Sequence, residues 1–171
     1  CHGYLVIYEI GNENMELVYK KATIKDIEIL TKSRVQVLIA ANKLPENTNM
    51  ENVKEKSYEY YREALKDGSH TAYLVFDGEI LVGTGGVSYY RVMPTYHNQG
   101  GRKAYIMNMY TKPEYRRKGI AKKTLDLLVK EAKSRGIQDI LLEATDMGRL
   151  LYKKYGFVKM DNEMELINFD D

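Results

Sequence analysis

The spacing of hydrophobic residues along the chain predicts strands and helices in alternation. The apolar run over 17–19 is typical of a short strand, and helical spacing then continues from Ile27 to Leu44-Pro45, where proline ends the helix. The later predicted elements are a helix over roughly 50–66, strands over 71–76, 79–87 and 103–111, a helix from about 121 to 135, a strand over 137–144, a short helix over 147–155 and one or two closing strands over 156–166. This order predicts a mixed α/β sheet with helices on its faces.

Local signals mark where several of these elements begin and end. Thr23 and Asp26 have the spacing of a capping box, which predicts a helix start. Asp77-Gly78, between two β-rich runs, predicts a tight hairpin. The glycines over 83–86 lack the pattern of a dinucleotide fingerprint and indicate a bulged or closely approached strand. Residues 89–102 are rich in turn formers and predict a long loop, where function often lies.

The first 14 residues are interpreted as an N-terminal extension or a segment of upstream origin. The chain begins without methionine, and a new apolar pattern starts at Leu17, just after Met15, which is a candidate natural start. A chain of 171 residues suits one domain of ordinary size. We therefore expect an extension over 1–14 and a single domain over 15–171.

Composition narrows the function classes. Lys and Arg number 26 and Asp and Glu 24, a net charge of +2 that is too small to predict a protein that wraps nucleic acid or coats a membrane. The single cysteine, Cys1, cannot form an internal disulfide, and no apolar run approaches the roughly 20 residues of a membrane span. The three histidines lack metal-ligand spacing. We expect a cytoplasmic protein without a metal, a membrane or a nucleic acid as partner.

A basic junction stands out between the strand over 103–111 and the helix that follows it. Five of the eight residues over 116–123 are Lys or Arg. Cations at a helix start oppose the positive end of the helix dipole, whereas a bound anion would reverse the sign of that interaction and could accept hydrogen bonds from the free N–H groups. Gly119 and Ala121 leave room for its close approach. The junction therefore indicates phosphate binding, with a solvated basic surface as the alternative.

Several segments resemble one known family. The pattern R-x-x-G-x-A over 116–121 resembles the pyrophosphate-binding motif of the GNAT acyltransferases, and the strand over 109–115 resembles the segment that leads into it. L-Y-K-K-Y-G-F over 151–157 and the opening over 18–26 are also similar to segments of that family. The resemblance covers about residues 15–168. It implies an α/β fold with a mixed, mainly antiparallel sheet flanked by helices, in which acyl-CoA is held at a splay between two parallel strands.

The resemblance also implies a catalytic site with acetyl-CoA as cosubstrate and no metal. The backbone N–H of Met109 would polarise the thioester carbonyl, and Tyr152 would donate a proton to the leaving thiolate, unless Tyr152 is simply a core aromatic. The cofactor-binding residues implied by the family are Met109, Tyr110, Thr111, Arg116, Arg117, Lys118, Gly119, Ile120, Ala121, Lys122, Thr145, Gly148 and Tyr152. Thr145 and Gly148 stand where the family often has asparagine and alanine, so the sequence departs from the family pattern at these two pantetheine-contact positions.

The general base is not assigned by the resemblance. Some family members carry a glutamate four residues before the position of Met109, where this chain has Tyr105. Glu143, Asp146 and His97 are the alternative candidates, each of which could equally be a surface or capping residue, and a chain of water molecules is a further route for the proton.

The acceptor site is expected near the two early helices and the loop over 89–102, which are rich in tyrosine. The tyrosines that could form its walls are Tyr58, Tyr60, Tyr61, Tyr89, Tyr90 and Tyr96. The glutamates that could attract an ammonium group, or that form only a hydrated helix face, are Glu51, Glu55 and Glu59.

The function favoured by these patterns is transfer of an acetyl group from acetyl-CoA to a primary amine of a small molecule. Acetylation of a peptide or protein amine is one alternative, and a non-catalytic acyl-CoA-binding sensor is another. A nucleic-acid-binding module would use the same basic junction but lacks a second basic stripe. Family members often form a homodimer, and the closing strands could pair across it.

Overall fold

The strands form one sheet in which sequence order and spatial order coincide. The structure, a computed structural model, describes residues 5–9 and 16–168. The six strands are β1 (Leu5–Glu9), β2 (Glu16–Lys21), β3 (His70–Asp77), β4 (Ile80–Arg91), β5 (Arg102–Thr111) and β6 (Asp139–Leu142). Neighbouring strands are antiparallel except β5 and β6, which are parallel. The predicted mixed and mainly antiparallel sheet is therefore confirmed.

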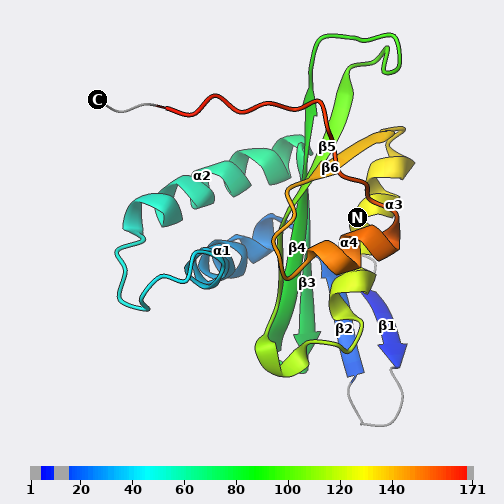
Figure 1. Ribbon diagram of the computed structural model, residues 1–171. Coiled ribbons are helices and arrows are strands. Elements are labelled where there is room, and N and C mark those ends of the chain that lie inside the picture. The colour runs from blue at the N-terminus through cyan, green and yellow to red at the C-terminus, as the bar shows by residue number, and fades with distance from the viewer. Residues whose placement is uncertain (1–4, 10–15, 169–171) are drawn as a thin grey trace.

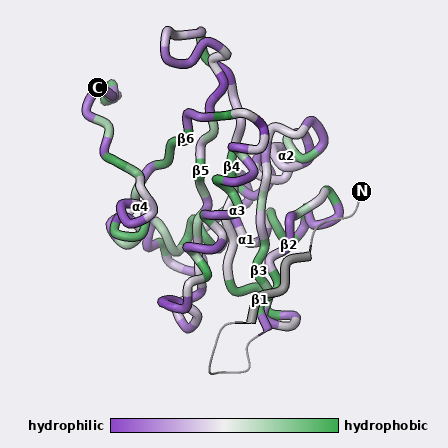
Figure 2. The backbone as a smooth tube through the Cα atoms, turned by 90° about the vertical axis from the view of Figure 1, so that its right-hand side faces the viewer, coloured by the Kyte–Doolittle hydropathy of each residue, from purple (hydrophilic) through white to green (hydrophobic). Residues whose placement is uncertain are grey.

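The helices cover both faces of this sheet. They are η1 (Ile24–Asp26), α1 (Ile27–Ala41), α2 (Glu51–Asp67), η2 (Pro113–Tyr115), α3 (Ile120–Ser134) and α4 (Arg149–Tyr155). Figure 1 shows α1 and α2 on one side of the sheet and α3 and α4 on the other. Hydrophobic stretches recur along the strands between these layers (Figure 2). No helix among the described residues has the length and apolar character needed to cross a membrane.

Each face of the sheet has its own hydrophobic core. Under α3, the side chains of Leu125 and Leu128 pack against Val87 and Ile106 of the central strands. On the other face the core is formed by Ala22, Ile27, Leu30, Tyr61, Ala72 and Leu74. The helices therefore bury their apolar stripes against opposite sides of the same strands, as amphipathic helices on a sheet do.

The capping box and the hairpin are confirmed. The Thr23 N–H donates to the Asp26 carboxylate at 2.8 Å, and the Thr23 hydroxyl oxygen accepts from the Lys25 N–H at 3.3 Å. Lys20 adds an ion pair to Asp26 at 2.7 Å, which ties the end of β2 to the start of the helical segment. β3 and β4 form the predicted antiparallel hairpin around Asp77-Gly78, with Gly78 at a φ of 57°.

Three predicted elements differ from the structure. β4 continues through Tyr89 and Tyr90 to Arg91, because these residues pair with the start of β5, so the predicted loop covers only 92–101. β6 is shorter than the predicted 137–144. The predicted closing strands over 156–166 are absent from the described chain: α4 ends at Gly156, whose φ is 122°, and the residues described after it form no strand.

The structure describes part of the predicted N-terminal extension. Within the predicted extension over 1–14, Leu5–Glu9 form β1, which pairs with β2 at the edge of the sheet. Met15, the candidate start, lies outside the described residues. The division into an extension over 1–14 and a domain over 15–171 stays a prediction.

The expected closely approached strand is confirmed on β4 and yields a stability prediction. A methyl group at Gly85 would lie 2.6 Å from Met109 Sδ and 2.9 Å from Thr124 Cγ2. We expect Gly85→Ala to lower the free energy of unfolding by about 1–3 kcal/mol, because α3 must move away from the sheet. Urea denaturation measures this loss. Gly100→Ala is the control, since its new methyl group meets no atom closer than 3.9 Å, and an equal effect of both substitutions would contradict the explanation.

Candidate functional site

The two parallel strands separate halfway along β5. They pair from Lys103 opposite Asp139 to Ile106 opposite Leu142, where β6 ends, while β5 continues to Thr111. Among the described residues, the edge of β5 over 107–111 therefore has no strand on the side of β6. Backbone groups on an open strand edge can pair with an extended ligand in the manner of an added strand. This is the splay that the family resemblance implies.

A bulge in β5 lies at the start of this open edge. Met107 pairs with Gly86 and Tyr110 with Thr84, so Asn108 and Met109 together stand opposite Gly85. Asn108 has a φ of 59°, a left-handed conformation that asparagine tolerates better than most residues. Because a bulge takes residues out of the regular ladder, it re-aims the backbone at this point.

The side chains around the bulge hold it from both faces of the sheet. Arg34 of α1 donates from Nη1 to Asn108 Oδ1 at 3.1 Å. Met109 packs with the core under α3, where Gly85 leaves room for its sulfur. The group that Met109 offers to the open edge is therefore its main chain.

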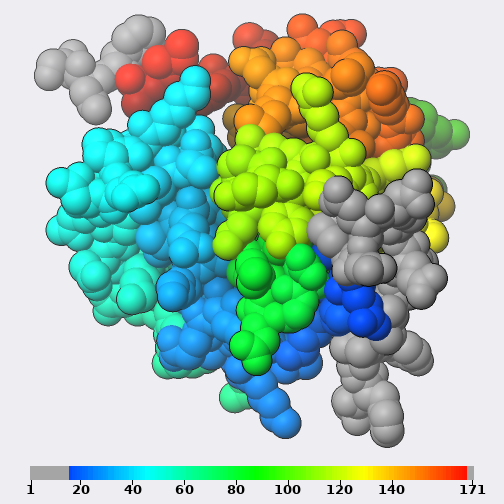
Figure 3. All heavy atoms as spheres, turned by 90° about the horizontal axis from the view of Figure 1, so that it is seen from below, coloured from blue at the N-terminus to red at the C-terminus, as the bar shows by residue number. Residues whose placement is uncertain are grey.

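The loop from β5 to α3 turns the backbone sharply before the helix begins. Arg117 has a φ of 62° and Gly119 a φ of 84°. The first backbone hydrogen bond of the helix runs from the Lys123 N–H to the Gly119 carbonyl at 3.0 Å. The N–H groups of Ile120, Ala121 and Lys122 precede this bond and lie outside the helical ladder. Figure 3 shows the yellow-green β5–α3 segment at the surface between the blue and cyan helices and orange α4.

Among the basic side chains near this loop, Arg116 contacts the preceding strand, and others are exposed to solvent. Arg116 donates from Nε to the Thr111 carbonyl at 3.0 Å, and its guanidinium lies 6.0 Å from the centre of the Tyr110 ring, so it ties the loop to the strand. Lys118 lies 5.6 Å from the centre of the Tyr115 ring. Arg117 and Lys122 are exposed. The loop thus presents N–H donors and positive charge together at one end of the open edge, which suits an anionic ligand.

Tyr152 lies on α4, across the splay from β5. Its side chain is buried and belongs to the same hydrophobic cluster against which Met109 packs. Its ring meets Phe157 edge to face, with 6.2 Å between the ring centres. Burial raises the pKa of the Tyr152 hydroxyl, so the group stays protonated at neutral pH and can act as a proton donor.

Thr145 and Gly148 belong to the turn between β6 and α4. The Gly148 N–H donates to Thr145 Oγ1 and to the Thr145 carbonyl, both at 3.2 Å. A methyl group at Gly148 would lie 2.7 Å from Tyr152 Cε2. The missing side chain therefore lets the Tyr152 ring fold back onto the turn, a packing reason for glycine where the family often has alanine.

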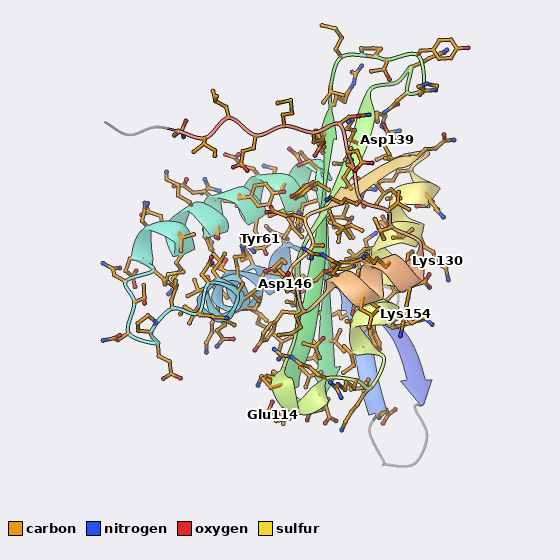
Figure 4. The ribbon with its side chains drawn as sticks, in the orientation of Figure 1. Tyr61, Glu114, Lys130, Asp139, Asp146 and Lys154 are labelled. Carbon is orange, nitrogen blue, oxygen red and sulfur yellow. The ribbon has the colours of Figure 1, made fainter. Side chains whose placement is uncertain are left out.

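The candidate bases occupy different environments. His97 lies in the loop over 92–101, at the opposite end of the β4–β5 hairpin from the bulge, and its ring meets that of Tyr96 edge to face. Asp146 is almost fully exposed and pairs with Arg149 at 3.4 Å, and Figure 4 shows it just before α4. Glu143 accepts a long hydrogen bond of 3.5 Å from the hydroxyl of Tyr105.

A cavity of about 590 Å³ lies between the α1–α2 layer and strands β4 and β5. We call it the tyrosine cavity. Its lining consists of Arg34, Lys56, Ser57, Tyr60, Tyr61, Ser69, His70, Ser88, Tyr89, Tyr90, Tyr105, Met107 and Asn108. Four of the six predicted wall tyrosines are among these residues. Asn108 connects the cavity to the bulge, so the cavity and the open edge meet at one point of β5.

The remaining predicted acceptor residues lie elsewhere. Tyr58, Glu51 and Glu55 line a separate groove of about 690 Å³ that shares no lining residue with the tyrosine cavity. Glu59 pairs with Lys56 at 3.3 Å, and Tyr96 is exposed on the loop. The structure therefore does not bring the three glutamates together with the tyrosines beside the bulge.

The sequence interpretation missed a buried histidine in the tyrosine cavity. His70 Nδ1 lies 3.1 Å from the Tyr60 hydroxyl and 3.2 Å from Ser88 Oγ, and these two oxygens are 2.7 Å apart. Burial lowers the pKa of His70 to about 4, and the positive charge of Arg34 adds to this effect. Figure 4 shows Tyr61, which stacks on the same ring, between α2 and the sheet. The three polar groups come from separate elements, so no local motif signals them.

Comparisons with known proteins agree with this geometry. The model of the acetyltransferase (GNAT) family matches residues 38–157. A curated relative, the uncharacterized N-acetyltransferase YsnE of Bacillus subtilis (strain 168), is 30% identical over 100 residues, which are 56% of this chain. The match spans 60% of the length of that relative.

Solved structures show the same fold. A predicted acetyltransferase with acetyl-CoA from Clostridium acetobutylicum superimposes with a TM-score of 0.80 and 36% sequence identity, over 88% of this chain and 96% of that chain. A GCN5-related N-acetyltransferase from Ralstonia eutropha JMP134 gives a TM-score of 0.76 at 22% identity, over 88% of this chain and 98% of that chain.

The depressed pKa of His70 predicts acid sensitivity of the fold. The unfolded chain, with a histidine pKa of 6.5, binds more protons than the folded chain down to a pH of about 4. The free energy of unfolding should therefore fall as the pH drops through this window, by about 3 kcal/mol in total. Urea denaturation across the window measures this loss. His70→Gln should flatten that dependence, whereas His97→Gln, at an exposed position, should keep it; equal slopes for all three proteins would contradict the assignment.

Proposed function

Since the chain belongs to the acetyltransferase (GNAT) family, we propose that it is an acetyl-CoA-dependent N-acetyltransferase whose acceptor is a primary amine of a small molecule. One observation carries the proposal. β5 runs past the end of β6 with a bulge at Asn108 and continues into a basic loop at a helix start. This arrangement provides a strand edge for an extended ligand and N–H donors for its anionic end.

The residues on this path fit the parts of acetyl-CoA. The loop residues Arg116, Arg117, Lys118, Gly119, Ile120, Ala121 and Lys122 would hold the pyrophosphate, because N–H donors outside the helical ladder and positive side chains gather there. The main chain of Met109, Tyr110 and Thr111 would pair with the pantetheine arm. Thr145 and Gly148, on the turn across the splay, would flank the same arm.

Two groups near the bulge would act on the reacting atoms. Acetyl-CoA supplies the acetyl group as a thioester, which an amine can attack directly. The Met109 N–H, in the bulge and next to the open edge, would donate a hydrogen bond to the thioester carbonyl and stabilise charge that develops on its oxygen. The buried, protonated Tyr152 hydroxyl would donate a proton to the departing thiolate.

The tyrosine cavity is the acceptor site in this proposal. It reaches β5 at Asn108, next to Met109, from the face of the sheet opposite to α3. Its volume of about 590 Å³ lies within the range typical of small-molecule sites. Among the three candidate bases, Glu143 is favoured, because Tyr105, whose hydroxyl donates to it, is a lining residue of this cavity.

A thiol-release assay tests the proposed activity and the role of Tyr152. Free coenzyme A is measured with acetyl-CoA and a panel of amino acids, polyamines, aminoglycosides and peptide amines. We expect release that requires one class of small amine and a kcat about 100-fold lower in Tyr152→Phe, because the proton donor is lost. Tyr155→Phe is the matched control, since that hydroxyl donates to Asp126 at 3.0 Å on α3.

Each negative outcome of this assay has its own meaning. Acetyl-CoA binding without amine-dependent release would favour the sensor alternative. Release with peptide amines alone would move the acceptor to that class, and an unchanged kcat in Tyr152→Phe would refute the assigned proton donor.

Substitution of Gly119 tests the pyrophosphate loop. Gly119→Glu puts a negative charge and a side chain in front of α3, so we expect the KM for acetyl-CoA to rise at least about 10-fold. Gly136→Glu is the matched control, because Gly136 ends the same helix with a similar φ of 76° and has equally open surroundings. Equal loss in both variants would indicate backbone strain instead of a bound phosphate.

A further inference from the structure

We infer that the amine acceptor carries an anionic group, a carboxylate or a phosphate, and that Arg34 binds this group in the tyrosine cavity. The inference rests on the proposed function and specifies the substrate class of its acceptor site. It derives from the charges that line the cavity, the position of Arg34 beside the bulge, and the hydroxyl groups that line the same cavity.

The charged residues that line the tyrosine cavity are all positive. It contains two cations, Arg34 and Lys56, and no Asp or Glu. Lys56 is exposed and already paired with Glu59. No carboxylate among the described side chains lies within ion-pairing distance of Arg34, whose one hydrogen bond in that set is to the neutral amide of Asn108. A half-buried guanidinium without a counter-ion favours an anion that arrives with the substrate.

Arg34 stands where it can act close to the reacting amine. Its Nη1 holds the side chain of Asn108, the neighbour of Met109 in the bulge. A guanidinium has several N–H donors in a fixed fork, so the bond to Asn108 orients the group and leaves other donors for a ligand. The fork geometry matches the paired oxygens of a carboxylate or a phosphate.

The polar groups next to Arg34 suit the same ligand. Tyr60 and Ser88 line the cavity, and their hydroxyls hydrogen-bond to each other, which uses one of their two protons. In the tautomer with a proton on His70 Nδ1, the other O–H remains to donate to an anion. His70 holds both of them through Nδ1 and, because burial lowers its pKa to about 4, it is neutral at physiological pH. Its imidazole therefore orients donors without adding a charge that competes with the substrate.

Acidic groups occur only outside the lining. Glu143 reaches the cavity through the hydroxyl of Tyr105, and the charges of Asp67 and Glu163 raise the pKa values of Tyr60 and Tyr90 after the larger effect of burial. These groups can favour the ammonium form of an arriving substrate. A polycation would instead face Arg34 directly, so an acceptor with one amine and one anionic group matches the arrangement better.

Matched pairs of amines test the inference with the complete chain. Phenylalanine is compared with phenylalanine amide for the carboxylate, and O-phosphoethanolamine with ethanolamine for the phosphate. We expect one anionic member to have a kcat/KM at least about 10-fold above its neutral partner. Arg34→Met should remove this preference, mainly through a higher KM for the anionic amine, whereas any disturbance of the bulge that Arg34 holds would lower the kcat/KM of both members of a pair equally.

Two further variants separate charge from folding. Arg34→Lys retains the charge but not the fork, so we expect it to keep part of the preference. Lys32→Met, at an exposed position on the same helix, removes a positive charge outside the cavity and should leave the preference intact.

The outcomes distinguish this inference from the proposed function. Failure of the wild-type protein to bind acetyl-CoA would refute both. Acetylation that ignores the anionic group, or an anionic preference that survives in Arg34→Met, would overturn the inference alone. Acetyl-CoA binding without acetylation of any of the four amines would also overturn it, because the class of acceptor would then be wrong.

Discussion

The requirement that backbone N–H and C=O groups find partners governs this molecule at one place, the edge of β5 beyond Ile106. β6 satisfies that edge as far as Leu142 and then ends, while β5 continues to Thr111. A strand edge without a neighbour is a liability unless a ligand or other cover occupies it. The bulge at Asn108, the bond that it accepts from Arg34 and the loop into α3 all lie beyond the point where this pairing stops.

Two neighbouring glycines show how both faces of the sheet converge on the bulge. Gly85 makes room for Met109 and Thr124 under α3, and Gly86 makes room for the ring of His70 under α2, whose Nε2 would lie 2.7 Å from a methyl group there. Since successive residues of a strand point to opposite faces, the thin section of β4 admits one large side chain from each side. The core under α3 and the tyrosine cavity under α2 are therefore separated here by a single layer of backbone.

Much of the fold could be predicted from the sequence because its signals are local. The capping box at Thr23, the Asp77-Gly78 hairpin and the amphipathic α3 each lie within a few residues of the chain. The residues over 116–121 could be assigned to an anion site for the same reason. That these residues bind the pyrophosphate, and that Met109 and Tyr152 act in catalysis, remain predictions, since position alone does not test a role.

The parts that escaped prediction depend on distant contacts. The cluster of Tyr60, His70 and Ser88 joins α2, β3 and β4, and no spacing along the chain marks it. The segment over 156–166 has an apolar pattern typical of strands, but a strand also needs a partner, and here Val158 and Met164 stay exposed instead. Glu51 and Glu55 follow helical spacing correctly but line a different groove, because the rotation of α2 is set by tertiary packing.

The separate origins of the tyrosine cavity and of the loop between β5 and α3 also bear on how such a protein can diverge. The tyrosine cavity, the proposed acceptor site, takes its lining from α1, α2, strands β3 to β5 and Ser69, whereas the proposed pyrophosphate loop lies between β5 and α3. Substitutions in the first set can alter which amine fits without disturbing the second. A lineage built on this scaffold could therefore exchange acceptors repeatedly while inheriting one unchanged means of holding the acyl donor.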